Sequence, residues 1–262
     1  MALLLLKLTL TPVLIGSASL AARRWGPSIG GWIVALPLTS GPVALYLAID
    51  QGSAYATSTA TASLGALLGD AVFALAYAWL SRRFSWPVCL LGGFAGFAAG
   101  ALAMAPMIGG TPLLVFGVVA VAMTLLLSLA PAPARAREPA PTPAWDIPAR
   151  MAAGTGIVLA ITEASVLLGP QLSGVLAAMP VYVSVLTVFA HQFEGADQAL
   201  GIVRGLQVGL FGTIVFFLVV TTALEPLGIG PAFGGAIVAT AAVQSISLRF
   251  LRRPIPPAVE VP

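Results

Sequence analysis

Long apolar runs alternate with short clusters of arginine, proline, glycine and acidic residues along the whole chain of 262 residues. The runs have the length of about 20 residues that a helix needs to cross a hydrocarbon core, and they lack the alternating pattern of a transmembrane β-strand. The pattern therefore predicts an all-α, polytopic membrane protein with about nine transmembrane helices. The expected spans are 2–22, 28–49, 54–80, 86–105, 113–130, 150–168, 171–191, 197–223 and 231–250.

The composition narrows the class further. Hydrophobic residues make up 59% of the chain and charged residues only 8%, whereas soluble domains carry about 25% charged residues. So few charges cannot cover a surface in water, which excludes an ordinary soluble protein. The single cysteine, Cys89, lies in an apolar run and can form no disulfide within the chain, so we expect a buried, unreactive thiol.

One stretch, Gly26 to Gly52, has a second copy at Gly169 to Gly195, and the alignment needs no gap because 169 minus 26 and 195 minus 52 are both 143. The identical pairs are Gly26/Gly169, Pro27/Pro170, Gly31/Gly174, Ala35/Ala178, Pro37/Pro180 and Gly52/Gly195. Roughly two or three identities would arise by chance in so apolar a window. The prolines at a fixed distance from paired glycines are the better evidence for a repeat.

The arginines give the orientation, because all of them fall on one side of an arrangement with nine spans, whereas eight spans would scatter them over both. They are Arg23, Arg24, Arg82, Arg83, Arg135, Arg137, Arg150, Arg204, Arg249, Arg252 and Arg253. By the positive-inside rule this side is the cytoplasm, so the N-terminus is expected outside and the C-terminus inside. The same placement explains the formal charge of +3, and we expect no nucleic-acid partner.

Nine spans divide into four, one and four, so the second unit would enter the membrane upside down relative to the first. The predicted arrangement is an inverted-topology repeat of the 4+1+4 type, which recurs in secondary transporters with a site near the middle of the membrane. The expected divisions are a first four-helix unit at 1–106, a connecting helix at 107–130, a proline-rich cytoplasmic linker at 131–149, a second four-helix unit at 150–252 and a cytoplasmic tail at 253–262.

Two prolines interrupt equivalent spans near mid-depth, Pro37 in the second span and Pro180 in the seventh. Each removes a backbone hydrogen bond and frees a carbonyl that a neighbouring helix, water or a ligand must satisfy. One interpretation is a plain kink, and the other is a substrate or ion site. Ser40 and Gly41 extend the first interruption while Ser184 follows the second, so such a site would be asymmetric.

Asp70 is the strongest candidate for a functional residue, because it lies near the middle of the third span, where a carboxylate costs at least ~2.5 kcal/mol. Thr59 and Ser63 precede it at a spacing that puts all three on one helical stripe. The hypothesis is a ligand-binding stripe. The competing interpretation is a protonated or hydrogen-bonded structural aspartate with hydroxyls that serve helix packing.

Three further polar residues lie in or at the edge of the expected spans. Glu163 is the other acid within a span, close to the end of the sixth. Gln207 in the eighth span is a ligand candidate or a hydrogen-bonding contact between helices. His191 closes the seventh span, where it is either a proton relay or a polar group at the membrane interface.

No metal cluster, nucleotide-binding glycine loop or nucleophile with an adjacent base stands out in the sequence, so we expect neither an enzyme nor a cofactor. The expected partners are the lipid bilayer and a small molecule or ion of unknown identity. A second copy of the chain or a cell-envelope complex is a further possible partner.

The segment Ala178-Met179-Pro180 through Glu194-Gly195 and Ala199 resembles the signature of the GlpM-like family of small bacterial inner-membrane proteins, and Ala35-Leu36-Pro37 through Gln51-Gly52 and Ala56 matches more loosely. The resemblance covers both units, so the chain looks like a fused tandem of that design. It implies a location in the bacterial inner membrane. The family provides no settled activity and no catalytic residues to transfer.

Two functions are consistent with these observations. The first is a secondary transporter of a small solute, in which two inverted units flank a site near Pro37, Pro180 and Asp70. The second is a non-transporting scaffold or accessory subunit of a cell-envelope system, whose buried polar residues only hold helices together.

Overall fold

The computed structural model describes the backbone of residues 2–107, 109–131, 143–177 and 179–251, and the side chains of residues 8–107, 109–131, 143–161 and 179–251. Within these ranges the chain is all-α and contains no β-strand. The helices are α1 (Ala2–Trp25), α2 (Pro27–Val34), α3 (Ser40–Asp50), α4 (Ser53–Leu80), α5 (Trp86–Met104), α6 (Pro112–Leu129), α7 (Asp146–Ala177), α8 (Val181–Glu194), α9 (Ala196–Leu227) and α10 (Ile229–Leu251), with a short 3-10 turn at Ala105–Met107.

Five helices of the described part are long and apolar enough to cross a membrane, namely α4, α5, α6, α9 and α10. Many large apolar side chains point outward from them, such as Leu91, Leu102 and Val238, which are about 70% exposed (71%, 70% and 70%). A surface of this kind suits lipid rather than water. The predicted all-α membrane class is therefore confirmed.

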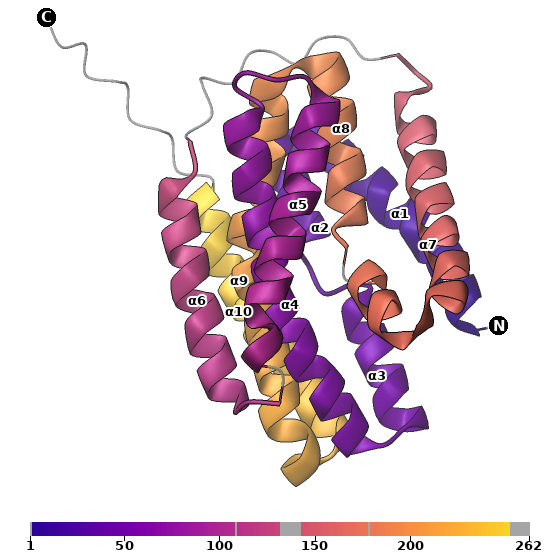
Figure 1. The fold of residues 1–262 in the computed structure, drawn as a ribbon, viewed down its shortest axis with the longest axis vertical. Coiled ribbons are helices and arrows are strands. Elements are labelled where there is room, and N and C mark those ends of the chain that lie inside the picture. Colours follow the sequence, from indigo (N-terminus) through magenta and orange to yellow (C-terminus); the bar gives the residue numbers. More distant parts are fainter. Residues whose placement is uncertain (1, 108, 132–142, 178, 252–262) are drawn as a thin grey trace, which may run out of the picture.

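Helix α9 forms the centre of the bundle. It packs against α2, α4, α6, α8 and α10, and its buried side chains lie on every side of the helix. A helix that is apolar all round is expected in the interior of a membrane bundle. In Figure 1 the other helices surround it, with α6 and α10 on one side and α1 and α7 on the other.

The connections divide between two ends of the bundle. The α4–α5 and α8–α9 connections lie at one end, and the α3–α4 and α9–α10 connections lie at the opposite end (Figure 1). The first of these ends, which we call the arginine end, carries the end of α1, the start of α7 and the end of α10. All seven arginines with described side chains belong to these segments or to the first turns of α9: Arg23, Arg24, Arg82, Arg83, Arg150, Arg204 and Arg249.

The predicted span at 28–49 is not one helix but two. Helix α2 ends at Val34 and α3 begins at Ser40, because Pro37 cannot supply the backbone N–H that would continue the ladder. The chain between them turns tightly, with the N–H of Leu38 bonded to the carbonyl of Leu36 at 2.7 Å. The break is thus longer than the single kink that a proline alone would give.

The predicted boundary between the sixth and seventh spans, at Gly169-Pro170, is wrong. Helix α7 continues through both residues to Ala177, and its last turns bend away from its upper part in Figure 1. The interruption instead comes before α8, which begins after Pro180. The linker is also shorter than predicted, because α7 already begins at Asp146.

Candidate functional site

Backbone groups at the break between α2 and α3 form hydrogen bonds within the protein. The hydroxyl of Thr213, on α9, donates a hydrogen bond to the carbonyl oxygen of Ala35. The N–H of Gly41 bonds to the carbonyl of Pro37 at 2.9 Å, and Ser40 is the first residue of α3. Of the two interpretations of Pro37, the structure favours a break that neighbouring helices complete.

Helix α2 packs on α9 with their backbones almost in contact. A Cβ added at Gly31 would overlap the backbone of α9 at Ile202, and one at Gly205 would overlap the carbonyl of Ser28. Small residues that allow such an approach are typical of helix packing in membranes. This contact holds α2, the first helix of the interrupted pair α2–α3, against α9.

The break before α8 has a different environment. The carbonyl of Pro180 accepts a bond from the Ser184 hydroxyl at 2.7 Å and one from the Ser184 N–H at 3.0 Å. One turn further, Thr187 is fully buried (0% exposed), yet its hydroxyl has no hydrogen-bond partner among the described residues. A buried polar atom without a partner costs about 1–3 kcal/mol, so Thr187 is a candidate for contact with a ligand or water.

The predicted stripe on α4 divides into two parts. The hydroxyls of Thr59 and Ser63 bond to carbonyls of their own helix, at Tyr55 and Thr59 respectively, both at 3.0 Å. Asp70 behaves differently, because its Oδ1 is buried and finds no hydrogen-bond partner in the described part of the chain. Asp70 lies ten residues before the end of α4, or about 15 Å from the arginine end.

Gln207 lies at a similar depth, eleven residues or about 16 Å into α9. It is 2% exposed, and neither its Oε1 nor its Nε2 has a partner in the described ranges. Helices α4 and α9 pack together, but no hydrogen bond joins Gln207 to Asp70. The expected hydrogen-bonding contact between helices is therefore absent at Gln207, within the residues that the structure describes.

His191 has a partner that the sequence did not indicate. Its Nδ1 shares a hydrogen bond of 3.1 Å with the hydroxyl of Tyr77, on α4, and the two rings meet edge to face at 5.9 Å. Tyr77 is fully buried. The two residues are 114 positions apart, so no local pattern could have paired them.

The Tyr77–His191 contact brings the last turns of α4 and α8 together. Both helices end at the arginine end (Figure 1), so they run parallel. One and two turns before His191, the same face of α8 carries Thr187 and Ser184, and two turns before Tyr77 the same face of α4 carries Asp70. The polar residues of the two helices thus form two stripes that meet where Tyr77 contacts His191.

Sequence reasoning missed a network of buried charges at the arginine end. Asp146, 0% exposed, accepts from Arg23 at 2.7 Å and from Arg150 at 3.0 Å, and Arg150 also reaches Glu194 at 3.0 Å. The guanidinium of Arg150 lies over the ring of Phe189. The network ties α1, α7 and α8 together. A sequence signal existed, because Asp146 and Arg150 have the i, i+4 spacing of a helical ion pair with a proline in the first turn.

The side chain of Glu163 lies outside the residues that the structure describes, so its predicted role stays a prediction. Among the described residues there is no group of three or more histidine, cysteine, aspartate or glutamate side chains that could hold a metal ion.

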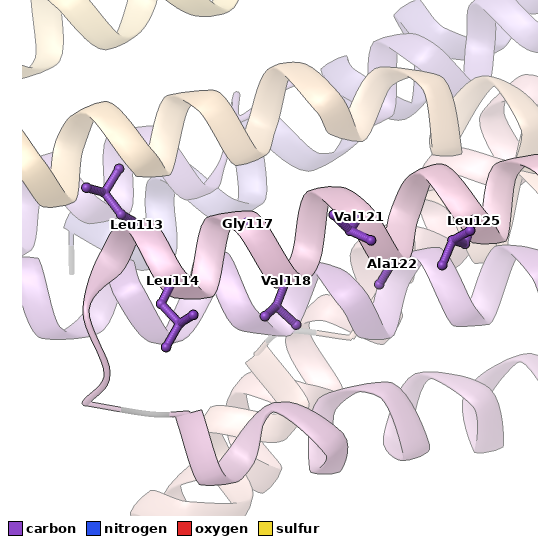
Figure 2. A pocket seen from close by; sticks show the side chains of 7 residues that line it. All are labelled: Leu113, Leu114, Gly117, Val118, Val121, Ala122 and Leu125. Atoms are coloured by element: carbon purple, nitrogen blue, oxygen red, sulfur yellow. The ribbon is translucent and has the colours of Figure 1, made fainter.

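A shallow groove runs along the outer face of α6. Figure 2 shows its lining, which comes from α6 alone: Leu113, Leu114, Gly117, Val118, Val121, Ala122 and Leu125. It contains no charged side chain, and Leu113 and Val121 are 68% and 62% exposed. Its chemistry suits acyl chains.

Comparisons with models of protein families, with curated proteins and with solved structures found no match to this chain. The resemblance to the GlpM-like family has no support from them and stays a prediction.

Proposed function

We propose that the protein is a secondary transporter of a small solute, with a mid-membrane site beside Asp70 between α4 and the interrupted pair α7–α8. The observation that carries the proposal is the buried Oδ1 of Asp70, which has no partner among the described residues. A carboxyl at this depth is costly, and in membrane proteins such groups usually face a ligand or ion pathway.

The predicted repeat supports a transporter, because helix boundaries recur at the same spacing of 143. Helix α2 ends at Val34 and α7 at Ala177, and α5 begins at Trp86 and α10 at Ile229. Gly52 and Gly195 precede α4 and α9 with φ of 88° and 96°, a region open mainly to glycine. The bends and turns of the two units thus fall at equivalent positions.

The directions of equivalent helices support the inversion. Helix α4 runs toward the arginine end and α9 runs away from it, and their preceding turns at Gly52 and Gly195 lie at opposite ends (Figure 1). If α2 with α3, and the last turns of α7 with α8, each make one crossing, the chain has nine spans. In this proposal the arginine end faces the bacterial cytoplasm, which puts the N-terminus outside.

The repeat also indicates what Asp70 faces. Thr213 minus 143 is position 70, and Thr213 is the residue that satisfies the break between α2 and α3. Asp70 is therefore the counterpart, in the other unit, of the residue that contacts a broken helix. By this equivalence Asp70 points at the break before α8, where Ser184 and Thr187 lie.

The network at the arginine end would close one entrance of such a site. Arg150, Asp146 and Glu194 join α7 to α8 above Tyr77 and His191. The counterpart of Glu194 at the opposite end is Gln51, an exposed neutral residue whose side chain bonds only to its neighbour Asp50 among the described residues. This asymmetry is what a carrier closed toward the arginine end requires.

The test of the architecture is labelling from one side of the membrane. In a background of Cys89→Ala, the variants Gln51→Cys and Gln192→Cys put single thiols at exposed positions of opposite ends. An impermeant maleimide should label the first in intact cells and the second only after permeabilisation. Labelling of both from the same side would reject the inverted repeat.

The test of transport is charge movement in a solid-supported membrane, with a panel of cationic, anionic and neutral solutes. We expect one solute class to produce a signal that Asp70→Asn reduces at least ~10-fold, because the carboxyl belongs to the site. Asp50→Asn, an exposed acid at the end of α3, is the matched control and should be normal. No response to any class, or an equal response from Asp70→Asn, would favour the scaffold function instead.

A further inference from the structure

We propose that Asp70 is a proton-binding group and that Tyr77 and His191 connect it to the arginine end. This inference deepens the proposed transporter, because it names the coupling ion and its route. It rests on the unpartnered Oδ1 of Asp70 and on the hydrogen bond that joins Tyr77 to His191.

The surroundings of Asp70 contain no counter-charge among the described residues. The three ion pairs found in these ranges all lie in the network at the arginine end. Titratable or charged groups on the helices packed against α4 make no hydrogen bond or ion pair with Asp70. These groups are Cys89 on α5, Tyr46 and Asp50 on α3, and Asp197, Arg204 and Glu225 on α9, while α6 has none.

Proton binding fits this site better than binding of a divalent metal ion. A divalent cation takes six or more oxygen ligands, or keeps several waters. Among the described residues, no group of three or more histidine, cysteine, aspartate or glutamate side chains could supply such a ligand set. A proton needs a single oxygen, and it removes the charge that is costly at this depth.

The route follows the polar stripes of α4 and α8, which meet where Tyr77 contacts His191. Asp70 and Tyr77 are seven residues apart, or about 10 Å along the helix. The unpartnered hydroxyl of Thr187 lies on the same face of α8 as His191, one turn before it. One turn beyond His191 is Glu194, a member of the network at the arginine end. Polar groups therefore occur at each turn between the middle of the bundle and that end.

The transfer needs a chain of water molecules between Asp70 and Tyr77, because Oδ1 of Asp70 and the hydroxyl of Thr187 have no hydrogen-bond partner among the described residues. A proton that leaves Asp70 passes to the first water, and the last water gives one of its own protons to the hydroxyl of Tyr77. Tyr77 gives its hydroxyl proton to Nδ1 of His191 across their 3.1 Å hydrogen bond, and His191 releases the proton from Nε2. Tyrosine hydroxyl and imidazole each both donate and accept, as a relay requires.

Infrared difference spectroscopy tests the binding step directly. The purified protein is reconstituted in vesicles of phosphatidylethanolamine and phosphatidylglycerol and titrated from pH 5 to pH 9. We expect a carboxylic acid C=O band that changes with pH, is lost in Asp70→Asn and is retained in Asp50→Asn. If the band is the same in Asp70→Asn, Asp70 does not bind the proton. If sodium chloride, but not choline chloride, removes it at constant pH, the site is one for a metal cation and the proposal is overturned.

The exchange rate of the same band tests the route. After rapid mixing with D₂O, the band should shift at least ~10-fold more slowly in Tyr77→Phe and in His191→Gln, because each lacks a group that transfers protons. Tyr46→Phe, on α3, is the control and should exchange normally. Persistence of the band shows that a variant is folded. Unchanged rates in both variants would overturn the route.

This experiment involves no transport. Proton binding without solute movement would reject the proposed function alone, and solute movement without the band would reject the inference alone.

Discussion

The two interrupted helix pairs are held in different ways. The pair α2–α3 is fixed at its break. The hydroxyl of Thr213 donates a hydrogen bond to the carbonyl of Ala35, and glycines allow α2 to pack closely against α9. The pair α7–α8 is fixed at the arginine end, where Arg150 joins the start of one helix to the end of the other. Within this second pair, the buried hydroxyl of Thr187 on α8 lacks a partner in the described part of the chain.

The residues of α4 and α9 at equivalent positions show the same difference. Gly205 and Gly209 of α9 admit α2 so closely that a Cβ at either position would overlap its atoms. Their counterparts on α4, 143 residues earlier, are Ala62 and Ala66, which already carry a Cβ and are only half-buried. The close approach that glycines allow between α2 and α9 is therefore not available at these positions of α4. This difference agrees with the proposed site beside the second pair.

The largest effect is expected from the charge network. Arg150→Met leaves Glu194 without a cation and Asp146 with Arg23 alone. Breaking a buried ion pair in this way costs about 3–5 kcal/mol. The free energy of unfolding can be measured by denaturation in mixed micelles, with Arg24→Met, at an exposed arginine of the same end, as the control. A loss no greater than that of the control would show that the network does not hold α7 to α8.

A smaller loss is expected at the contact between α2 and α9. Gly205→Ala puts a methyl group against the carbonyl of Ser28, and overpacking of this kind costs about 1–3 kcal/mol. Gly234→Ala is the matched control, because a Cβ at Gly234 meets nothing within 4 Å. The same unfolding measurement compares them, and equal stability of the two variants would contradict the close packing of the first pair.

The smallest effect on the free energy of unfolding is expected at Thr213 and Asp70, the two residues at equivalent positions of the repeat. Thr213→Val leaves the carbonyl of Ala35 without its donor and should cost about 1 kcal/mol. Asp70→Asn removes a charge that has no described partner at Oδ1, so it should not lower the free energy of unfolding. If Asp70→Asn is the more destabilising of the two, Asp70 is a structural residue and the comparison fails.

The apolar runs predicted the all-α membrane class and most helix positions, because a length of about 20 residues is set by the bilayer. Pro37 and Pro180 likewise marked the two interruptions. The extent of each break did not follow from the sequence, since it depends on which neighbour satisfies the freed carbonyls. Gly169-Pro170 has the composition of a boundary, but α7 continues through it.

The sequence could predict a residue of the candidate site only where the position of that residue within a single helix identified it. The depth of Asp70 follows from its place within a single apolar run, so it could be singled out. Tyr77 was not singled out, because its polar partner, His191, comes from a distant helix. Asp146 was assigned to the linker because prolines surround it. Contacts between helices decide such roles, and periodicity within one helix carries no information on them.

The charge network also has a consequence for biosynthesis. Arg23 and Asp146 are separated by 123 residues, which a ribosome adds in roughly 6–25 s at the usual rates of synthesis. Throughout that time the end of α1 lacks the acid that it pairs with in the finished protein. Helix α1 is therefore synthesised well before the acid that its Arg23 binds, and its contact at the arginine end is completed by a helix from the other half of the chain.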